Sequence, residues 1–174
     1  RPKGLELASD NVKRPKFPTV GELDQPTARG RILHFFANHE LLALELMALT
    51  LLRFPEAPKR FRKRLVATMR DEQKHMRLYM ERMDTFDVQM GEIPLNSFFW
   101  DQLSGVPSLR EFVAGMSLTF EQANLDFSLY YRDLFQTMGD NQTARIMDRV
   151  LRDEVAHVRH GVEYLNGTRA PDLT

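Results

Sequence analysis

The sequence predicts an all-α fold, a four-helix bundle in which two antiparallel helix pairs are joined by a long crossover. Four long segments have apolar residues every three or four positions, the period of an amphipathic helix, and no segment of any length alternates as a strand does. The motif Asp-Glu-x-x-His occurs twice, at Asp71–His75 and at Asp153–His157. A stretch rich in proline, glycine and aromatic residues, from about residue 88 to 107, separates two halves of similar design.

Composition limits the classes of protein that need be considered. A chain of 174 residues has room for one domain with a real core. Its net charge is zero, which disfavours a nucleic-acid partner without excluding one. The richest apolar run, Leu41–Leu52, is interrupted by Glu45, so we expect no membrane partner. Cysteine is absent, which leaves oxygen and nitrogen as metal ligands and is compatible with the cytoplasmic location that we expect.

The first half of the chain is expected to hold an arm and two helices. Residues 1–26 contain several prolines among scattered charges and read as an extended arm across the bundle, which itself occupies residues 27–166. The first helix begins near Pro26, with Thr27 as its N-cap, and ends at about Arg53. The second helix runs from about Pro58, placed in its first turn, to Phe86.

The second half repeats this plan. A third helix opens at Ser108, where Ser108 and Glu111 fit a capping box, and continues without a break to a cap at Gly139. Asp140 or Asn141 caps the fourth helix, which runs to Leu165. Residues 167–174 are expected to form a C-terminal tail.

Four glutamates and two histidines form two matching sets. Each Asp-Glu-x-x-His motif places a Glu and a His on one face of a helix. A further Glu lies 32 residues before the first of these glutamates and 33 residues before the second. Unpaired carboxylates on apolar helical faces are costly, and two divalent cations would balance four of them. The sequence therefore predicts a two-metal site of the kind found in di-iron and di-manganese carboxylate bundles, with these ligands: Glu40, Glu72, His75, Glu121, Glu154 and His157.

Other polar residues near this set are assigned different roles. Glu45 and Asp126 lie five residues beyond Glu40 and Glu121, about 140° round the helix, so they should face elsewhere, in ion pairs or hydrogen bonds between helices. His160, one turn beyond the second motif, is a candidate seventh ligand, with a role outside the site or on the surface as the alternative.

Three tyrosines and two further histidines complete the candidates. One of the tyrosines is a candidate to hydrogen-bond near the metals: Tyr79, Tyr130 or Tyr164. His34 and His39 are expected to be structural residues.

A Glu followed by Glu-x-x-His, repeated after a crossover, resembles the ferritin-like di-iron carboxylate superfamily. More specifically, the segments His39–Glu45, Phe120–Asp126 and Leu151–Val158 resemble an uncharacterised bacterial ferritin-like family, a domain of unknown function, over about residues 27 to 166. This resemblance implies a four-helix bundle that holds the six ligands above, with Glu72 and Glu154 bridging the metals.

The Asp that precedes each motif Glu is similar to one in the multicomponent di-iron monooxygenases. By that analogy Asp71 would orient His157 and Asp153 would orient His75, which is the support that ligating histidines usually have. Oxygen-rich ligation with some imidazole suits iron, and manganese or a mixed pair is the alternative.

Three functions agree with these patterns. The leading hypothesis is a di-iron oxidase or monooxygenase that activates dioxygen, acts on an unknown small-molecule or macromolecular substrate, and takes electrons from a donor. The second is a ferroxidase or iron-handling protein; the missing fifth helix and the N-terminal arm disfavour a cage, and we expect a monomer or dimer. The third is a non-catalytic or RNA-binding bundle, which a resemblance to tRNA-hydroxylating di-iron enzymes allows. Such a bundle would bind RNA through the basic run from Lys59 to Arg64. A solvated helix face is the simpler interpretation of that run.

Overall fold

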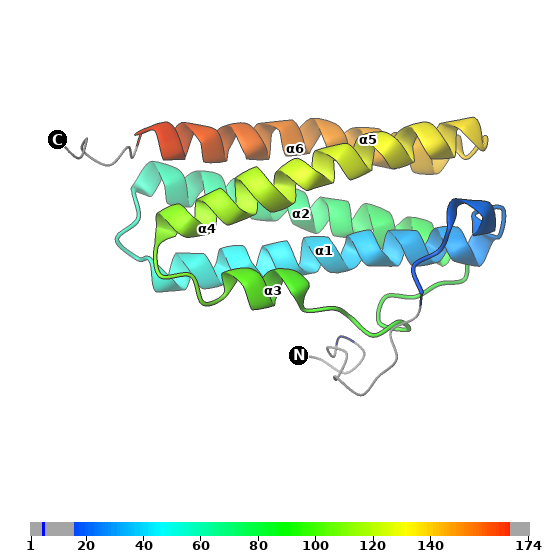
Figure 1. Cartoon of the computed structure of the whole chain (residues 1–174), viewed down its shortest axis with the longest axis horizontal. Coiled ribbons are helices and arrows are strands. Elements are labelled where there is room, and N and C mark those ends of the chain that lie inside the picture. The colour runs from blue at the N-terminus through cyan, green and yellow to red at the C-terminus, as the bar shows by residue number, and fades with distance from the viewer. Residues whose placement is uncertain (1–4, 6–15, 168–174) are drawn as a thin grey trace.

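The computed structural model describes residue 5 and residues 16–167. These residues contain six α-helices, one 3-10 helix and one π-helical segment, joined by turns and loops (Figure 1). Helix α1 (Pro26–Arg53) pairs antiparallel with α2 (Lys59–Asp84). In the second half, α6 (Asn141–Gly167) pairs antiparallel with a rod of three consecutive segments: α4 (Leu109–Gly115), η2 (Met116–Glu121) and α5 (Gln122–Thr137). The predicted all-α bundle of two antiparallel pairs joined by a crossover is therefore confirmed.

The short elements differ from the prediction. The 3-10 helix η1 (Val20–Glu22) forms inside the segment expected to be extended, and helix α3 (Phe98–Leu103) forms inside the crossover and lies along α1 (Figure 1). The third helix is one rod as predicted, but it is not α-helical throughout, because η2 is a π-helical segment, whose turns are wider than those of an α-helix. Residues 1–4 and 6–15 of the arm and the tail from residue 168 lie outside the described residues.

A glycine lets α6 approach the π-helical segment closely. A Cβ atom at Gly161 would lie 2.2 Å from the Cβ of Ser117 in η2, a distance that two real side chains do not reach. Because η2 ends at Glu121, this contact holds a predicted metal ligand against the helix that carries the second motif.

Several helix ends follow the predicted signals and two do not. The Ser108 side chain accepts the Glu111 backbone N–H at 3.2 Å, and Gly139 has φ +79°, the left-handed conformation that glycine adopts readily at a helix end. Thr27 is not the N-cap of α1: Gln25 is, because Pro26, which needs no hydrogen-bonded N–H, occupies the first helical turn. Pro58 is likewise the N-cap of α2 and not a residue of its first turn.

Two apolar clusters fill the ends of the bundle and leave a polar layer between them. One contains residues near the start of α1 and the end of α2, such as Phe36 and Met83, and the other contains residues near the end of α1 and the start of α2, such as Met47 and Phe61. Burying one such side chain contributes about 1.5–3 kcal/mol. The predicted ligands lie in the layer between the clusters, which therefore clamp it from both ends.

Helix α1 is the most apolar element of the described chain. Contrary to the expectation from sequence, it contains an 18-residue window long and apolar enough to cross a membrane; Glu45 does not lower the mean hydropathy enough to prevent this. Half of that window, 50%, is buried inside the bundle, where α1 contributes to both apolar clusters. Its position at the centre of the packing accounts for its composition.

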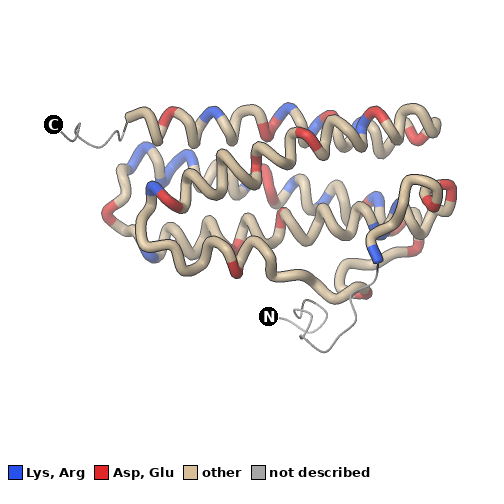
Figure 2. Tube along the Cα trace, viewed as in Figure 1, with Lys and Arg blue, Asp and Glu red and all other residues tan. Residues whose placement is uncertain are grey.

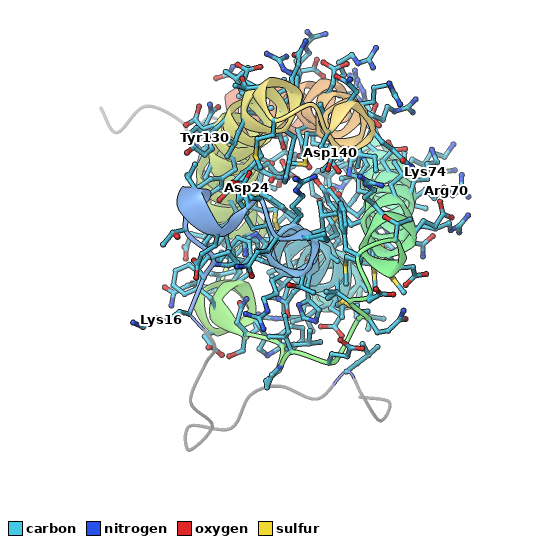
Figure 3. All side chains as sticks on the ribbon, turned by 90° about the vertical axis from the view of Figure 1, so that its right-hand side faces the viewer. Lys16, Asp24, Arg70, Lys74, Tyr130 and Asp140 are labelled. Carbon is cyan, nitrogen blue, oxygen red and sulfur yellow. The ribbon has the colours of Figure 1, made fainter. Side chains whose placement is uncertain are left out.

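Asp140 joins the second helix pair to the first. Its Oδ1 accepts the Thr143 backbone N–H at 3.1 Å, and its carboxylate receives Arg82 at 2.8 Å and Arg29 at 3.4 Å. Figure 3 shows Asp140 where α5 turns into α6, whereas Arg70 and Lys74 point to solvent. Burial alone would raise the pKa of Asp140, but the hydrogen bonds from Thr143 and the charge of Arg82 lower it.

Replacing Asp140 with alanine is expected to lower the free energy of unfolding by about 2–4 kcal/mol, because the change removes an N-cap and leaves two arginines without their buried partner. Urea unfolding followed by circular dichroism would measure it. Asp133→Ala, at an exposed carboxylate paired with Arg132, is the matched control and should change stability by less than about 1 kcal/mol. A loss as small in Asp140→Ala would contradict the role given to this residue.

Candidate metal centre

The six predicted ligands all lie in the polar layer at the middle of the bundle. Figure 2 shows acidic positions halfway along α1 and along the α4–α5 rod, among uncharged segments. All six side chains are buried, which is rare for glutamate unless a partner compensates its charge: Glu40, Glu72, His75, Glu121, Glu154 and His157.

These residues form two groups with the composition of metal sites. In the first group, ligand atoms of Glu40, Glu72, His75 and Glu154 all lie within 4.8 Å of one another. In the second group, ligand atoms of Glu72, Glu121 and His157 meet the same criterion. Glu72 belongs to both groups. The structure thus brings all six residues together into buried carboxylate–histidine clusters that can hold metal ions.

The two imidazoles turn the same nitrogen toward the centre. His75 Nδ1 lies 3.0 Å from Glu72 Oε2, and His157 Nδ1 lies 3.2 Å from Glu72 Oε1 and 3.3 Å from Glu154 Oε2. Each ring points its Nε2 away from the glutamates of the cluster. A neutral imidazole that binds a metal through Nδ1 carries its proton on Nε2, so both rings are turned as ligands would be.

Each outward nitrogen faces the aspartate of the other motif. His75 Nε2 lies 3.2 Å from Asp153 Oδ2, and His157 Nε2 lies 3.6 Å from Asp71 Oδ2. A basic residue covers each aspartate from outside: Arg149 donates to Asp153 at 2.8 Å, and Lys74 donates to Asp71 at 2.7 Å. This crosswise geometry allows each aspartate to fix the orientation of an imidazole, as histidine ligands require.

Protons take the place of cations in this cluster when no metal is bound. Burial first, and then the charge of Glu72, hold the pKa of Glu40 well above its ordinary range. Burial and the charge of Glu154 raise the pKa of Glu121 to about 8. Burial opposes charge on His157 too, but hydrogen bonds with Glu154 and Glu72 raise its pKa to about 11. The site therefore attracts positive charge strongly.

Two carboxylate oxygens in the cluster are buried and have no hydrogen-bond partner in the part of the chain that the structure describes. These atoms are Oε1 of Glu40 and Oε2 of Glu121. A buried polar atom without a partner costs about 1–3 kcal/mol, and more when it is charged. A cation beside Glu40 and a second beside Glu121 would satisfy both oxygens, so the donors present fit a pair of divalent ions.

A pocket of about 630 Å³ opens from the surface onto these carboxylates. Its inner end is formed by four of the predicted ligands: Glu40, Glu72, Glu121 and Glu154. Its walls come from α1, from the arm before η1, from the crossover with α3, and from η2 and α5. Phe17, Phe98 and Phe127 line it and are exposed, so they mark its mouth. A small molecule can therefore reach the cluster from solvent.

Sequence reasoning missed Asn124, which lines this pocket. Its Nδ2 donates to Glu154 Oε1 at 2.9 Å, and its Oδ1 is buried without a partner among the described residues. The feature of the sequence that indicates its closeness to the site is its position three residues after Glu121, on the same helical face. Asn124 thus orients a carboxylate of the cluster and leaves one amide oxygen buried without a partner beside it.

The other candidates lie outside both groups. His160 is half-buried, its ring 5.5 Å from that of Phe61, and burial lowers its pKa. Neither Glu45, which is half-buried, nor Asp126, which is exposed, belongs to either group. The ion pair or hydrogen bond expected for Asp126 does not occur among the described residues, because its side chain is exposed.

The tyrosines and structural histidines differ in their closeness to the site. Tyr79 is fully buried, its hydroxyl has no partner among the described residues, and burial followed by the charge of Glu40 raises its pKa. Tyr130 is exposed, and Tyr164 packs on Phe61 with ring centroids 4.7 Å apart. The ring of His34 accepts the Gly91 N–H at 3.2 Å. His39 lines the pocket, and burial lowers its pKa to about 3.

The basic start of α2 is partly neutralised within the chain. Arg64 pairs with Glu163 of α6, and Arg60 lies 3.9 Å from the same carboxylate. Arg62 donates to the Pro55 carbonyl oxygen at 2.6 Å. These contacts favour the interpretation of this run as a solvated face that also holds α2 to α6.

The fold and the site define a class: a helical bundle with buried carboxylate–histidine clusters that can hold metal ions. The chain belongs to the family described as "protein of unknown function (DUF455)", whose model it matches over residues 1–171. No curated protein and no solved structure gives a significant match to it. The expected membership in a family of unknown function is confirmed, and the wider placement in the ferritin-like superfamily stays a prediction.

Proposed function

We propose that this chain is a ferritin-like di-iron carboxylate protein that activates dioxygen, as an oxidase or monooxygenase of a small molecule. The observation that supports this most is the meeting of two carboxylate–histidine groups, which share Glu72, at the inner end of a pocket open to solvent. A protein that only stores iron needs no such pocket. Dioxygen and an external electron donor are the co-reactants that this function requires.

The ligand set agrees with iron in two ways. Four carboxylates and two neutral imidazoles balance two divalent ions, and oxygen-rich ligation with some nitrogen suits iron, with manganese or a mixed pair as the alternative. When bound, the two ferrous ions would supply the electrons that dioxygen takes up. The group with Glu121 offers three donors where the group with Glu40 offers four, so it has the more open coordination on which an incoming molecule depends.

The chain's own residues supply the rest of the chemistry. Glu72 lies between the groups and would hold the two ions at a fixed separation. Asp153 lies within hydrogen-bonding distance of His75 Nε2, and Asp71 lies 3.6 Å from His157 Nε2; with their Nε2 protons turned toward these aspartates, the two rings would keep Nδ1 free for a metal. The walls of the pocket are largely apolar, so a ligand that fills it would displace water from the cluster and strengthen the electrostatic interactions there.

Metal uptake and oxygen consumption test this function. Metal-free protein would be refilled with ferrous iron without oxygen, its metal content measured by mass spectrometry, and oxygen then admitted in an electrode cell. We expect about two iron ions per chain and oxygen uptake in proportion to them. Glu154→Ala removes a ligand of the group with Glu40 only, so it should bind about one iron ion and lose oxygen uptake, whereas Glu163→Ala, at a carboxylate exposed on the same helix, should lose neither. A folded wild-type protein without stoichiometric metal, or with iron that consumes no oxygen, would contradict the proposal.

A further inference from the structure

One side of the pocket is a continuous series of rings, which we name the aromatic wall: Phe17, Phe35, His39, Phe99 and Phe120. Along it, neighbouring ring centroids are 4.9, 4.0, 4.5 and 4.1 Å apart. The wall draws on four segments, from the arm to η2, and it ends one residue before Glu121. Rings at such distances favour an aromatic ligand, which gains offset or edge-to-face contacts beyond simple burial.

The outer part of the pocket carries positive charge and the inner part carries negative charge. Arg31 lies on the same stripe of α1 as Phe35 and Asn38, one turn nearer the mouth. It makes no ion pair within the described residues, and the only carboxylates in the lining are the four at the inner end. Lys16 also lines the pocket, but Figure 3 shows its side chain extending away from the bundle. Arg31 is therefore the group placed to bind an anion.

The spacing of these features sets the size of the ligand. Arg31 and Glu40 are nine residues apart on α1, about 13 Å along the helix axis. A molecule that reaches from one to the other is longer than a single benzene ring with one acidic substituent.

We propose that the pocket binds an aromatic molecule of about two rings that carries an acidic group, with its rings on the aromatic wall and its acid at Arg31. This inference rests on the proposed function in that such a ligand would place its far end at the metal ligands as a substrate.

Two fluorescent probes that differ by one acid test the proposal. N-phenyl-1-naphthylamine is uncharged, and 8-anilinonaphthalene-1-sulfonate is the same ring system with a sulfonate; both brighten in an apolar site. Titrations of the full chain, metal-free and again with zinc, should show one site per chain that prefers the sulfonate. Arg31→Gln should weaken sulfonate binding about tenfold, the order of one charge-assisted hydrogen bond, and leave the neutral probe unchanged.

Ala123→Phe, which fills the pocket from α5, should abolish binding of both probes. Two controls match these variants: Gln122→Phe, at the exposed neighbour outside the pocket, and Arg77→Gln, at an exposed arginine of α2, should change nothing. Unfolding curves would establish that each variant is folded.

The outcomes separate the parts of the proposal. Equal affinity for the two probes, or sulfonate binding unaffected by Arg31→Gln, overturns the acidic group. Binding of both probes by a folded Ala123→Phe variant places them elsewhere and overturns the ligand assignment altogether. Because metal content is measured independently, a chain that binds the probes but no iron contradicts the proposed function alone, and a chain that binds iron but neither probe contradicts only this inference.

Discussion

Glu72→Ala is expected to abolish binding of both metal ions, whereas Glu121→Ala should remove only one. The reason is that Glu72 contributes to both groups and Glu121 only to the group with His157. Mutating a residue that only hydrogen-bonds to a metal ligand lowers metal affinity by up to roughly 100-fold. Removing a ligand itself should lower the affinity by at least that factor. Titration with cobalt(II), followed by its visible absorption and by mass spectrometry, would give the stoichiometry of each variant.

The matched control for both is Glu81→Ala, a carboxylate of α2 that belongs to neither group. It should bind the same number of ions as the wild type. If Glu72→Ala still bound one ion with unchanged affinity, the two ions could not share this residue, and the arrangement of the centre proposed here would be wrong.

Metal-free protein is expected to lose stability as the pH rises from 5 to 8, which is the reverse of ordinary acid denaturation. The pKa of Glu121 is raised from 4.5 to about 8, and that of His157 from 6.5 to about 11. Both groups bind protons in the folded chain that the unfolded chain has released. The stability that Glu121 contributes is therefore complete below pH 4.5 and lost by about pH 8, and that of His157 declines above pH 6.5.

Each such group lowers the free energy of unfolding by about 1.4 kcal/mol per pH unit over its interval. His39, whose pKa is lowered from 6.5 to about 3, opposes this change up to pH 6.5, so a net loss of about 3 kcal/mol or more is expected between pH 5 and 8. Urea unfolding in the presence of a chelator would measure it. Glu121→Gln, which cannot ionise, should show a shallower slope. Metal binding displaces these protons, so metal affinity should rise over the same range. A metal-free protein that gains stability from pH 5 to 8 would refute this account.

Sequence could predict which carboxylates and imidazoles cluster because much of that information is local. Glu72 and His75 share a helical face through their spacing alone, and the same holds for Glu154 and His157. The level at which the pairs meet follows from where the chain reverses, near Pro55 and Gly139. The crosswise placement of Asp71 and Asp153 needed an analogy with other proteins, because it depends on how one helix pair is set against the other.

The parts that could not be predicted depend on contacts between distant segments. The segment Met116–Glu121 reads as an ordinary helix, and its close approach to Gly161 joins residues 44 positions apart in the chain. Helix α3 was missed because six residues are too few to show a period. The pocket required the course of the crossover, and Asn124 became meaningful only once the pocket and Glu154 were both in place.

The ligands and much of the pocket's outer wall come from separate parts of the chain. All six predicted ligands are on the two helix pairs, but Phe17, Ile93 and Phe99 are on the arm, the crossover and α3. Substitutions in these connecting segments can therefore change which molecules enter without altering any donor atom. Natural or engineered changes in the segments that connect the helices can therefore alter the substrate of such a bundle while its metal ligands stay the same.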